Sequence, residues 1–120
     1  MRADFEDLEN GGFFFTAGDH EALIQRPKSW QDEAMPCGNA IAALGLQRLG
    51  LLIGDRACCD SALRALKSVA EPVETNPLYA AGFTRLLAEI EQPPKHIVVR
   101  GDPGRVARLA GTLLPGPVAR

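Results

Sequence analysis

The most apolar run of this chain lies between residues 40 and 53 and predicts a helix that begins near Asn39. Asparagine is a residue type that caps helix N-termini, and Gly54 is of the type that ends helices. A helix that is apolar all round is normally buried all round, so we expect this one at the centre of the core. Its apolar side chains occupy nearly every side: Ile41, Leu44, Leu46, Leu49, Leu51, Leu52 and Ile53.

Two amphipathic helices are predicted after it. The first is capped by Asp55 and ended by Pro72, and the second begins at Asn76-Pro77 and ends at Pro93. Apolar residues recur at three- and four-residue intervals in both, which predicts one buried face per helix. The expected buried faces are Cys59, Ala62, Leu63, Leu66, Val69 and Ala70, then Tyr79, Phe83, Leu86, Leu87 and Ile90.

The N-terminal part of the chain has a different pattern. Residues 1–12 are polar and acidic, and we interpret them as a tail or as the end of a preceding helix. Two β-prone runs, residues 13–16 and 21–26, flank a Gly18-Asp19 turn. This spacing predicts a small β-hairpin, and a polar loop follows it.

The C-terminal part predicts a strand at residues 97–99 and a helix at residues 105–114. A single strand leaves its backbone groups unpaired, which suggests a truncated unit. The whole pattern predicts a mainly α fold of antiparallel helix hairpins, the unit of α/α barrels. We interpret the chain as one partial domain: residues 1–36 (acidic tail, β-hairpin and loop), 37–94 (three helices) and 95–120 (strand–helix unit).

Composition is that of an ordinary globular chain, with 120 residues, 46% of them hydrophobic, 23% charged, and a net charge of −2. The densest basic stretch (Arg100, Arg105 and Arg108) is too sparse for a nucleic-acid surface. The apolar run is too short to span a bilayer, and the N-terminus lacks the apolar core of a secretory signal. We therefore expect a cytoplasmic protein with no nucleic-acid or membrane partner.

Three cysteines, Cys37, Cys58 and Cys59, do not form a disulfide framework. Adjacent residues on a helix point about 100° apart, and no histidine completes a zinc set beside Cys58 and Cys59. We therefore expect neither a metal nor a cofactor, and we place Cys59 in the core. Cys37 precedes a helix, where a thiol can become reactive. No histidine is fixed beside it, so a structural role is favoured.

The strongest candidate for chemistry is His20 beside Glu21, because a histidine near carboxylates can act as a general base. The alternative is a polar turn exposed to water. Arg26 and Lys28 could hold a carboxylate, a phosphate or sugar hydroxyls, together with Asp32. Alternatively, Arg26 and Asp32 pair to fix the loop.

Three other features each have a functional and a structural interpretation. Trp30 could stack on a sugar ring or anchor the loop. Asn39 is a candidate for substrate binding, but its type and position favour a helix cap. The Gly101-Asp102 turn before a helix lacks the spacing of a phosphate-binding loop, and a turn with a helix cap accounts for it.

Six stretches of the chain carry a resemblance to a known family: residues 11–16, 19–24, 26–28, 36–39, 54–55 and 97–103. Together they resemble the spermatogenesis-associated, thioredoxin-domain-containing family. That family usually has serine where this chain has Cys37. The resemblance implies the late part of a helical barrel of the six-hairpin glycosidase type, similar to barrels of sugar epimerases. The thioredoxin-like domain of that family is not represented here, so its redox chemistry is not implied.

This resemblance implies a parent protein that binds or acts on a carbohydrate-like small molecule, with His20 and Glu21 as catalytic residues. Arg26, Lys28, Asp32 and Asn39 would then bind the substrate. The alternative is a non-enzymatic helical module that self-associates or packs against the remaining barrel hairpins, supported by the apolar first helix. A third hypothesis, a thiol-based redox protein, rests only on the family architecture and the odd number of cysteines.

Overall fold

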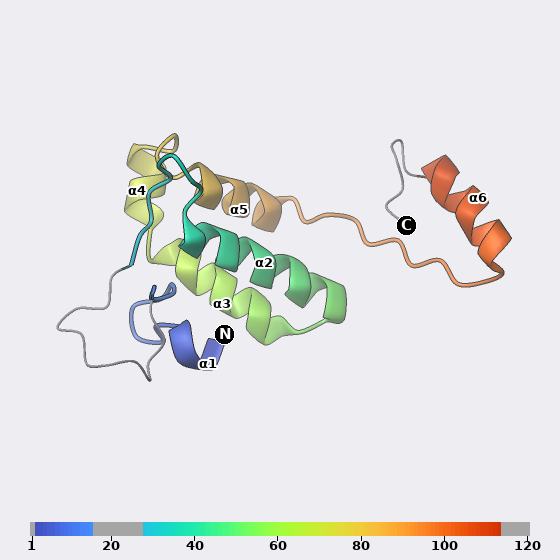
Figure 1. The fold of residues 1–120 in the computed structure, drawn as a ribbon, viewed down its shortest axis with the longest axis horizontal. Coiled ribbons are helices and arrows are strands. Elements are labelled where there is room, and N and C mark those ends of the chain that lie inside the picture. Colours follow the sequence, from blue (N-terminus) through green and yellow to red (C-terminus); the bar gives the residue numbers. More distant parts are fainter. Residues whose placement is uncertain (1, 16–27, 114–120) are drawn as a thin grey trace.

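The structure is a computed structural model that describes residues 2–15 and 28–113 of the chain. Within these residues the chain is mainly α-helical and contains no strand, which confirms the predicted fold class at that level. The helices follow one another as shown in Figure 1. They are α1 (Arg2–Phe5), α2 (Gly38–Ile53), α3 (Arg56–Lys67), α4 (Ala70–Thr75), α5 (Ala81–Glu91) and α6 (Pro103–Leu113).

The centre of the fold is the antiparallel pair α2 and α3, joined by Gly54 and Asp55 (Figure 1). Gly54 takes the left-handed conformation (φ 73°) that glycine adopts without strain, and the Asp55 side chain accepts a hydrogen bond from Ala57 N at 2.9 Å. This confirms the predicted junction. Gly50 lets the helices approach closely, because a Cβ there would lie 2.6 Å from Cys59 Sγ.

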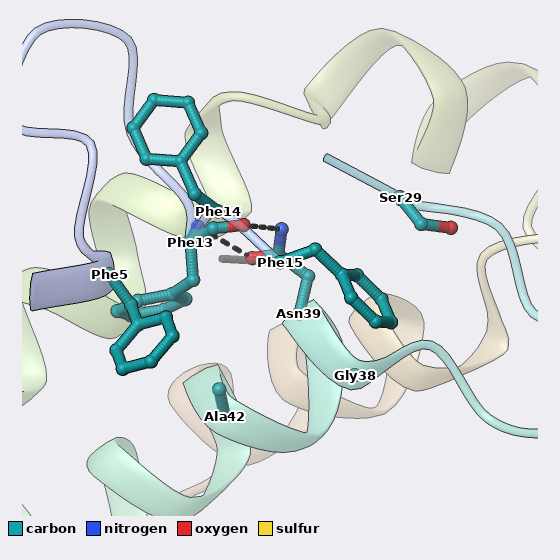
Figure 2. A pocket seen from close by; sticks show the side chains of 8 residues that line it. All are labelled: Phe5, Phe13, Phe14, Phe15, Ser29, Gly38, Asn39 and Ala42. Atoms are coloured by element: carbon teal, nitrogen blue, oxygen red, sulfur yellow. Dashed lines mark hydrogen bonds between the residues drawn. The ribbon is translucent and has the colours of Figure 1, made fainter. Parts of the chain in front are cut away.

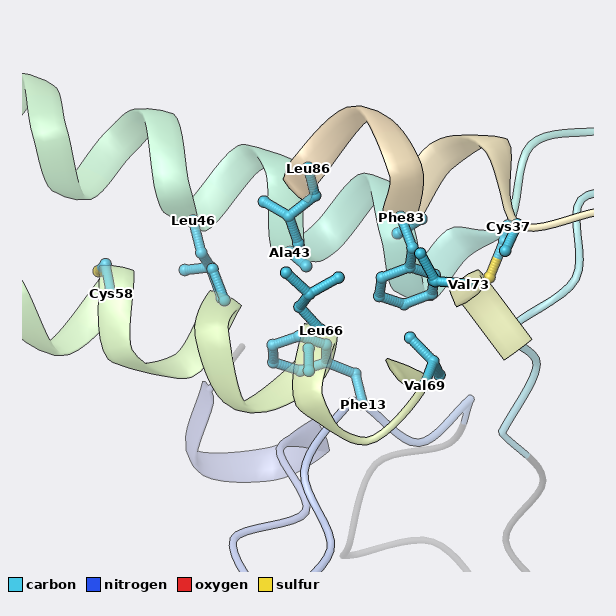
Figure 3. Packing of buried hydrophobic residues seen from close by; sticks show 14 residues of the cluster. Phe13, Cys37, Ala43, Leu46, Cys58, Leu66, Val69, Val73, Phe83 and Leu86 are labelled. Atoms are coloured by element: carbon cyan, nitrogen blue, oxygen red, sulfur yellow. The ribbon is translucent and has the colours of Figure 1, made fainter. Parts of the chain in front are cut away.

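The hydrophobic core forms where α5 and the N-terminal segment pack against this pair (Figure 3). Phe83 and Leu86 of α5 are almost completely buried, as predicted. Cys58, rather than the expected Cys59, is buried in the core. The remaining core residues are Phe13, Cys37, Ala40, Ala43, Leu46, Ala62, Ala65, Leu66, Val69, Val73 and Ala80.

One face of α2 is left uncovered, and the expectation that α2 is buried on all sides is wrong for the described part of the chain. Ile41, Leu49, Leu52 and Ile53 are 55%, 45%, 71% and 61% exposed. The physical reason is that the helices packed against α2, chiefly α3 and α5, cover only part of its circumference. We call these four residues the outer face of α2.

Two helix boundaries differ from the prediction. The second helix ends at Lys67, and Pro72 lies in the first turn of the separate helix α4. Proline is tolerated there because the first N–H groups of a helix have no partner within it. The third helix begins at Ala81 rather than Pro77, so Tyr79 is outside it and exposed. The carbonyl of Tyr79 accepts a hydrogen bond from Asp32 N at 2.8 Å, which holds the preceding turn in place.

The N-terminal residues are not a free tail. Phe13 forms an antiparallel bridge with Glu6, and Glu6 forms an ion pair with Arg64 of α3. Phe13 also enters the core (Figure 3). Residues 16–27, which include the predicted second strand of the hairpin, lie outside the described residues.

The strand predicted at residues 97–99 is not formed, because no described strand lies beside it. Residues 93–100 are extended and connect the helical bundle to α6, which lies well apart from it in Figure 1. Asp102 caps α6 by accepting hydrogen bonds from Gly104 N and Arg105 N at 3.1 and 3.2 Å. The radius of gyration is 17.5 Å, against roughly 14 Å for a compact domain of this length, in agreement with the separated C-terminal unit.

Candidate functional site

The predicted site residues Lys28, Asp32 and Asn39 lie where the N-terminal segment meets the first turn of α2. Asn39 is the second residue of α2 and not its cap, which corrects the expectation, since Cys37 occupies the cap position. Its side-chain amide accepts from Phe13 N at 3.0 Å and donates to Phe13 O at 2.8 Å (Figure 2). It therefore pairs with both backbone groups of Phe13, as a neighbouring strand would.

Lys28 is held by three contacts on the same side of the molecule. Its ammonium group forms an ion pair with Asp7, donates to the carbonyl of Gly11 at 2.9 Å, and lies 4.6 Å from the ring centre of Phe14. Asp7 also accepts from the backbone N–H groups of residues 9 and 10, both at 3.0 Å. The Lys28 ammonium, followed by the backbone N–H of residue 10, holds the pKa of Asp7 well below its usual range.

Asp32 joins the starts of two helices. One carboxylate oxygen accepts from Cys37 N at 2.7 Å, at the start of α2, and the other accepts from Gly82 N at 2.8 Å, in the first turn of α5. Negative charge is stabilised at both places because helix N-termini carry unpaired N–H groups. Arg26, the alternative partner for Asp32, lies outside the described residues, as do His20 and Glu21.

The structure brings together Lys28, Asn39 and Trp30, which line one hollow of about 180 Å³ with Gly12 and Ser68. Trp30 is half-buried and packs against the core, as expected of an anchor. Ligand pockets are usually larger, about 300 Å³ or more. Among the described residues, Asp7 and Gly11 accept hydrogen bonds from the Lys28 ammonium, which can donate three.

A larger pocket of about 280 Å³ lies beside it (Figure 2). Four phenylalanines, Phe5, Phe13, Phe14 and Phe15, line most of it. Its other lining residues are Ser29, Gly38, Asn39 and Ala42. The side-chain amide of Asn39 is already paired with Phe13, so this pocket is suited to apolar groups rather than to a hydroxyl-rich molecule.

A third hollow, of about 460 Å³, lies between the C-terminal halves of α2 and α5. Its lining includes Arg48, Glu89 and His96. Arg48 Nε donates to Glu89 at 2.9 Å, and Arg85 donates to the same carboxylate at 3.3 Å. The hydrogen bond with Arg48 lowers the pKa of Glu89 and raises that of Arg48, so both groups are ionised and satisfy each other.

The cysteines occupy structural positions. Cys37 is buried, and its thiol donates to the carbonyl of Ser29 at 3.1 Å. Cys58 donates to an Asp55 carboxylate oxygen at 3.2 Å. None of the three cysteines forms a disulfide, and the described residues contain no cluster of three His, Cys, Asp or Glu side chains suited to a metal ion.

Sequence reasoning missed the part played by Asp7 and the turn after it. A usable signal was present, because aspartate three residues before Asn10-Gly11 is typical of a turn in which the carboxylate accepts backbone N–H bonds. Gly11 and Gly12 have φ values of 77° and 80°, which favour glycine. The pairing of Asn39 with Phe13, 26 residues away, had no comparable signal.

Comparisons with known proteins agree with the resemblance seen in the motifs. Spermatogenesis-associated protein 20 of Mus musculus and that of Rattus norvegicus are each 32% identical to the chain over 100 residues. The protein of that name from Homo sapiens is 31% identical over 99 residues. Each match covers 82% of this chain and 13% of the relative, so the chain spans about an eighth of these proteins' length.

No family model and no solved structure matches the chain. Among the described helices, none combines the length and the apolar character that crossing a membrane requires. The chain is thus a distant relative of spermatogenesis-associated protein 20, similar to one segment of that protein.

Proposed function

We propose that this chain supplies a helical hairpin to a larger helical protein, and that the outer face of α2 packs against further helices of that protein. The observation that carries the proposal is the exposure of Leu52 and Ile53, at 71% and 61%. At about 100° per residue, the four residues of the outer face fall within an arc of roughly 120°. Gly45 lies inside this arc with no atom near its missing Cβ, so a neighbouring backbone can approach closely.

The length of the relatives supports this choice of partner over a second copy of the chain, because the aligned segment is only 13% of each relative. The antiparallel hairpin of α2 and α3 and the family resemblance support an α/α barrel of the six-hairpin glycosidase type as the larger structure. In that barrel, burial of the outer face would complete the apolar surroundings that the sequence of α2 implies.

The test substitutes glutamate into the outer face of the longer protein. Leu52→Glu removes apolar contact area, and burial of such a side chain is worth about 1.5–3 kcal/mol. We expect Leu52→Glu to lower the melting temperature of the longer protein, measured by calorimetry. Ala57→Glu, at an exposed position on α3, is the matched control and should change it little.

The same variants distinguish the alternative, a self-associating or protein-interaction module. Light scattering during gel filtration would then show a dimer of the longer protein that Leu52→Glu dissociates. If the two variants have equal melting temperatures and the protein is a monomer at all concentrations, the outer face neither packs against further helices nor mediates self-association.

We propose as a second function that the segment of residues 20–32 contributes to a carbohydrate pocket of the longer protein. The family resemblance supports this, together with the position of Lys28 in a hollow that Trp30 also lines. His20 would act as a general base, with Glu21 beside it as the second catalytic residue, and Arg26, Lys28, Asp32 and Asn39 would position the sugar.

Calorimetric titration of the full-length protein with a panel of monosaccharides and their N-acyl derivatives tests this second function. We expect His20→Ala to abolish turnover while binding persists, and Arg26→Ala to weaken binding at least tenfold. Asp60→Ala, at an exposed position on α3, is the control. Unchanged binding and turnover in His20→Ala and Arg26→Ala would exclude residues 20–32 as part of a carbohydrate-binding site.

A further inference from the structure

Residues 93–101, between α5 and α6, form a stretch of backbone without hydrogen-bonded backbone partners among the described residues. It runs as an extended chain from the bundle to α6 (Figure 1), and it makes no backbone–backbone hydrogen bond with any described residue. Such a row of unpaired N–H and C=O groups is a ready template for another strand. Water can satisfy these backbone groups, and another strand can replace that water by forming hydrogen bonds with them.

The side chains of this segment are those of a strand. Ile97, Val98 and Val99 are β-branched, a type enriched in strands because it packs well on a pleated surface. Ile97 is 55% exposed and Val98 is 84% exposed. Successive side chains of a strand point to opposite faces, so Ile97 and Val99 share one face and Val98 lies on the other. Val98 therefore exposes apolar surface on one face, whereas on the other face Ile97 is exposed and Val99 is half-buried.

Charge decides what kind of strand fits. Lys95 and Arg100 flank the apolar residues, and no acidic residue lies between them. Parallel, in-register pairing of two copies would place Lys95 against Lys95 and Arg100 against Arg100. Antiparallel pairing that places Ile97 opposite Val98 would place Lys95 opposite Arg100. Like charges directly opposite each other destabilise a strand pair, so a second copy is disfavoured and acidic flanks are favoured.

We propose that residues 95–100 form a β-strand by pairing with an extended peptide segment that is apolar in its centre and acidic at both ends. Backbone hydrogen bonds would supply the affinity, and the contacts of the acidic ends with Lys95 and Arg100 would supply the specificity. The proposal does not rest on the proposed function, because it concerns the backbone edge of residues 95–100, although Leu52 and His96 line the same hollow.

The test measures amide hydrogen exchange of residues 97–100 by NMR, on the full chain. The probe is a synthetic peptide with blocked ends and the sequence Glu-Thr-Val-Thr-Val-Glu, in millimolar excess. We expect exchange of the amides that face the peptide to slow by roughly tenfold or more, as for a hydrogen bond of ordinary net strength. The matched control peptide, Lys-Thr-Val-Thr-Val-Lys, should give no protection.

Proline variants identify the pairing edge. A strand presents the N–H of alternate residues to its two edges, so either Val98→Pro or Val99→Pro removes a hydrogen bond to the peptide. One of the two should abolish protection, while Val98→Thr, which keeps both the N–H and the β-branch, retains it. The helix content of the chain, measured by circular dichroism, should be unchanged, because residues 97–100 lie outside the helices.

Four results would overturn the proposal. The first is the absence of protection by the acidic peptide. The second is equal protection by the acidic and the lysine peptides, which would exclude selection by charge. The third is protection that survives both proline variants. The fourth is protection that rises with protein concentration without any peptide, which would identify a second copy as the partner.

Discussion

Two glycines of α2 provide a matched test of how α2 and α3 pack. A Cβ at Gly50 would lie 2.6 Å from Cys59 Sγ, 2.7 Å from the backbone oxygen of Asp55 and 3.1 Å from Cys58 Cβ. The Asp55 oxygen belongs to the tight junction between the helices, so it cannot move without moving the junction. At Gly45, on the same helix, a Cβ would meet no atom within 4 Å.

Alanine at the two positions should therefore have opposite effects on the free energy of unfolding. Alanine is favoured over glycine in a helix by about 1 kcal/mol, and overpacking costs about 1–3 kcal/mol. We expect Gly45→Ala to stabilise the chain by about 0.5–1 kcal/mol. Gly50→Ala should destabilise it by about 1–2 kcal/mol, since the clash involves backbone as well as side-chain atoms.

Urea unfolding followed by circular dichroism at 222 nm measures both changes in one experiment. The slope of free energy against urea concentration should be the same in both variants, which would show that the unfolded state is unchanged. If Gly50→Ala is as stable as Gly45→Ala, α2 and α3 do not pack closely at Gly50.

Three further predictions concern the contacts of the N-terminal segment and of Asp32. Asn39→Ala leaves both backbone groups of Phe13 without their partner, and it should lower the free energy of unfolding by about 1–3 kcal/mol in the same urea assay. The pKa of Asp7 is lowered on folding, so its contribution to stability is present above its ordinary pKa of 3.8 and is lost as the pH falls below it. Urea melts from pH 7 to pH 2 should show a steeper acid loss in the wild type than in Asp7→Asn, and parallel curves would contradict the ion pair with Lys28. Asp32→Ala should increase amide exchange in the first turns of both α2 and α5, and an effect on one helix alone would refute its bridging role.

The sequence predicted best where structure depends on neighbouring residues. The α2–α3 junction follows from the local chemistry of Gly54 and Asp55, and both took the expected conformations. The buried stripe of α5 at Phe83 and Leu86 follows from helical periodicity. Each depends on residues within a few positions in the chain, which is the range that a sequence pattern describes.

The errors share a different cause, because each depended on a partner that is distant in sequence or absent from the described chain. The start of α5 depends on Asp32, whose N–H donates to Tyr79 O and whose carboxylate accepts from Gly82 N, 50 residues away in the chain. The periodicity of α2 indicated burial on every side, but α3 and α5 cover only part of it. The residues 97–99 have strand character without a strand to pair with.

The candidate site was predictable in part. Lys28, Asp32 and Asn39 were singled out by residue type, and the structure shows them close to the start of α2 with protein partners. Their partners could not be predicted, since Asp7 and Phe13 reach them across more than twenty residues. A carbohydrate role for these residues stays a prediction.

The short connection between α2 and α3 has a consequence for the order of folding. A two-residue junction closes the hairpin with little loss of chain entropy, so the contacts around Gly50 can form before any distant ones. The pairings that tie down the N-terminal segment span 26 residues for Asn39 and Phe13 and 58 for Glu6 and Arg64, and they close much longer loops. The α2–α3 hairpin should therefore act as the folding nucleus, and substitutions in it should slow folding, whereas substitutions at Phe13 or Glu6 should mainly speed unfolding.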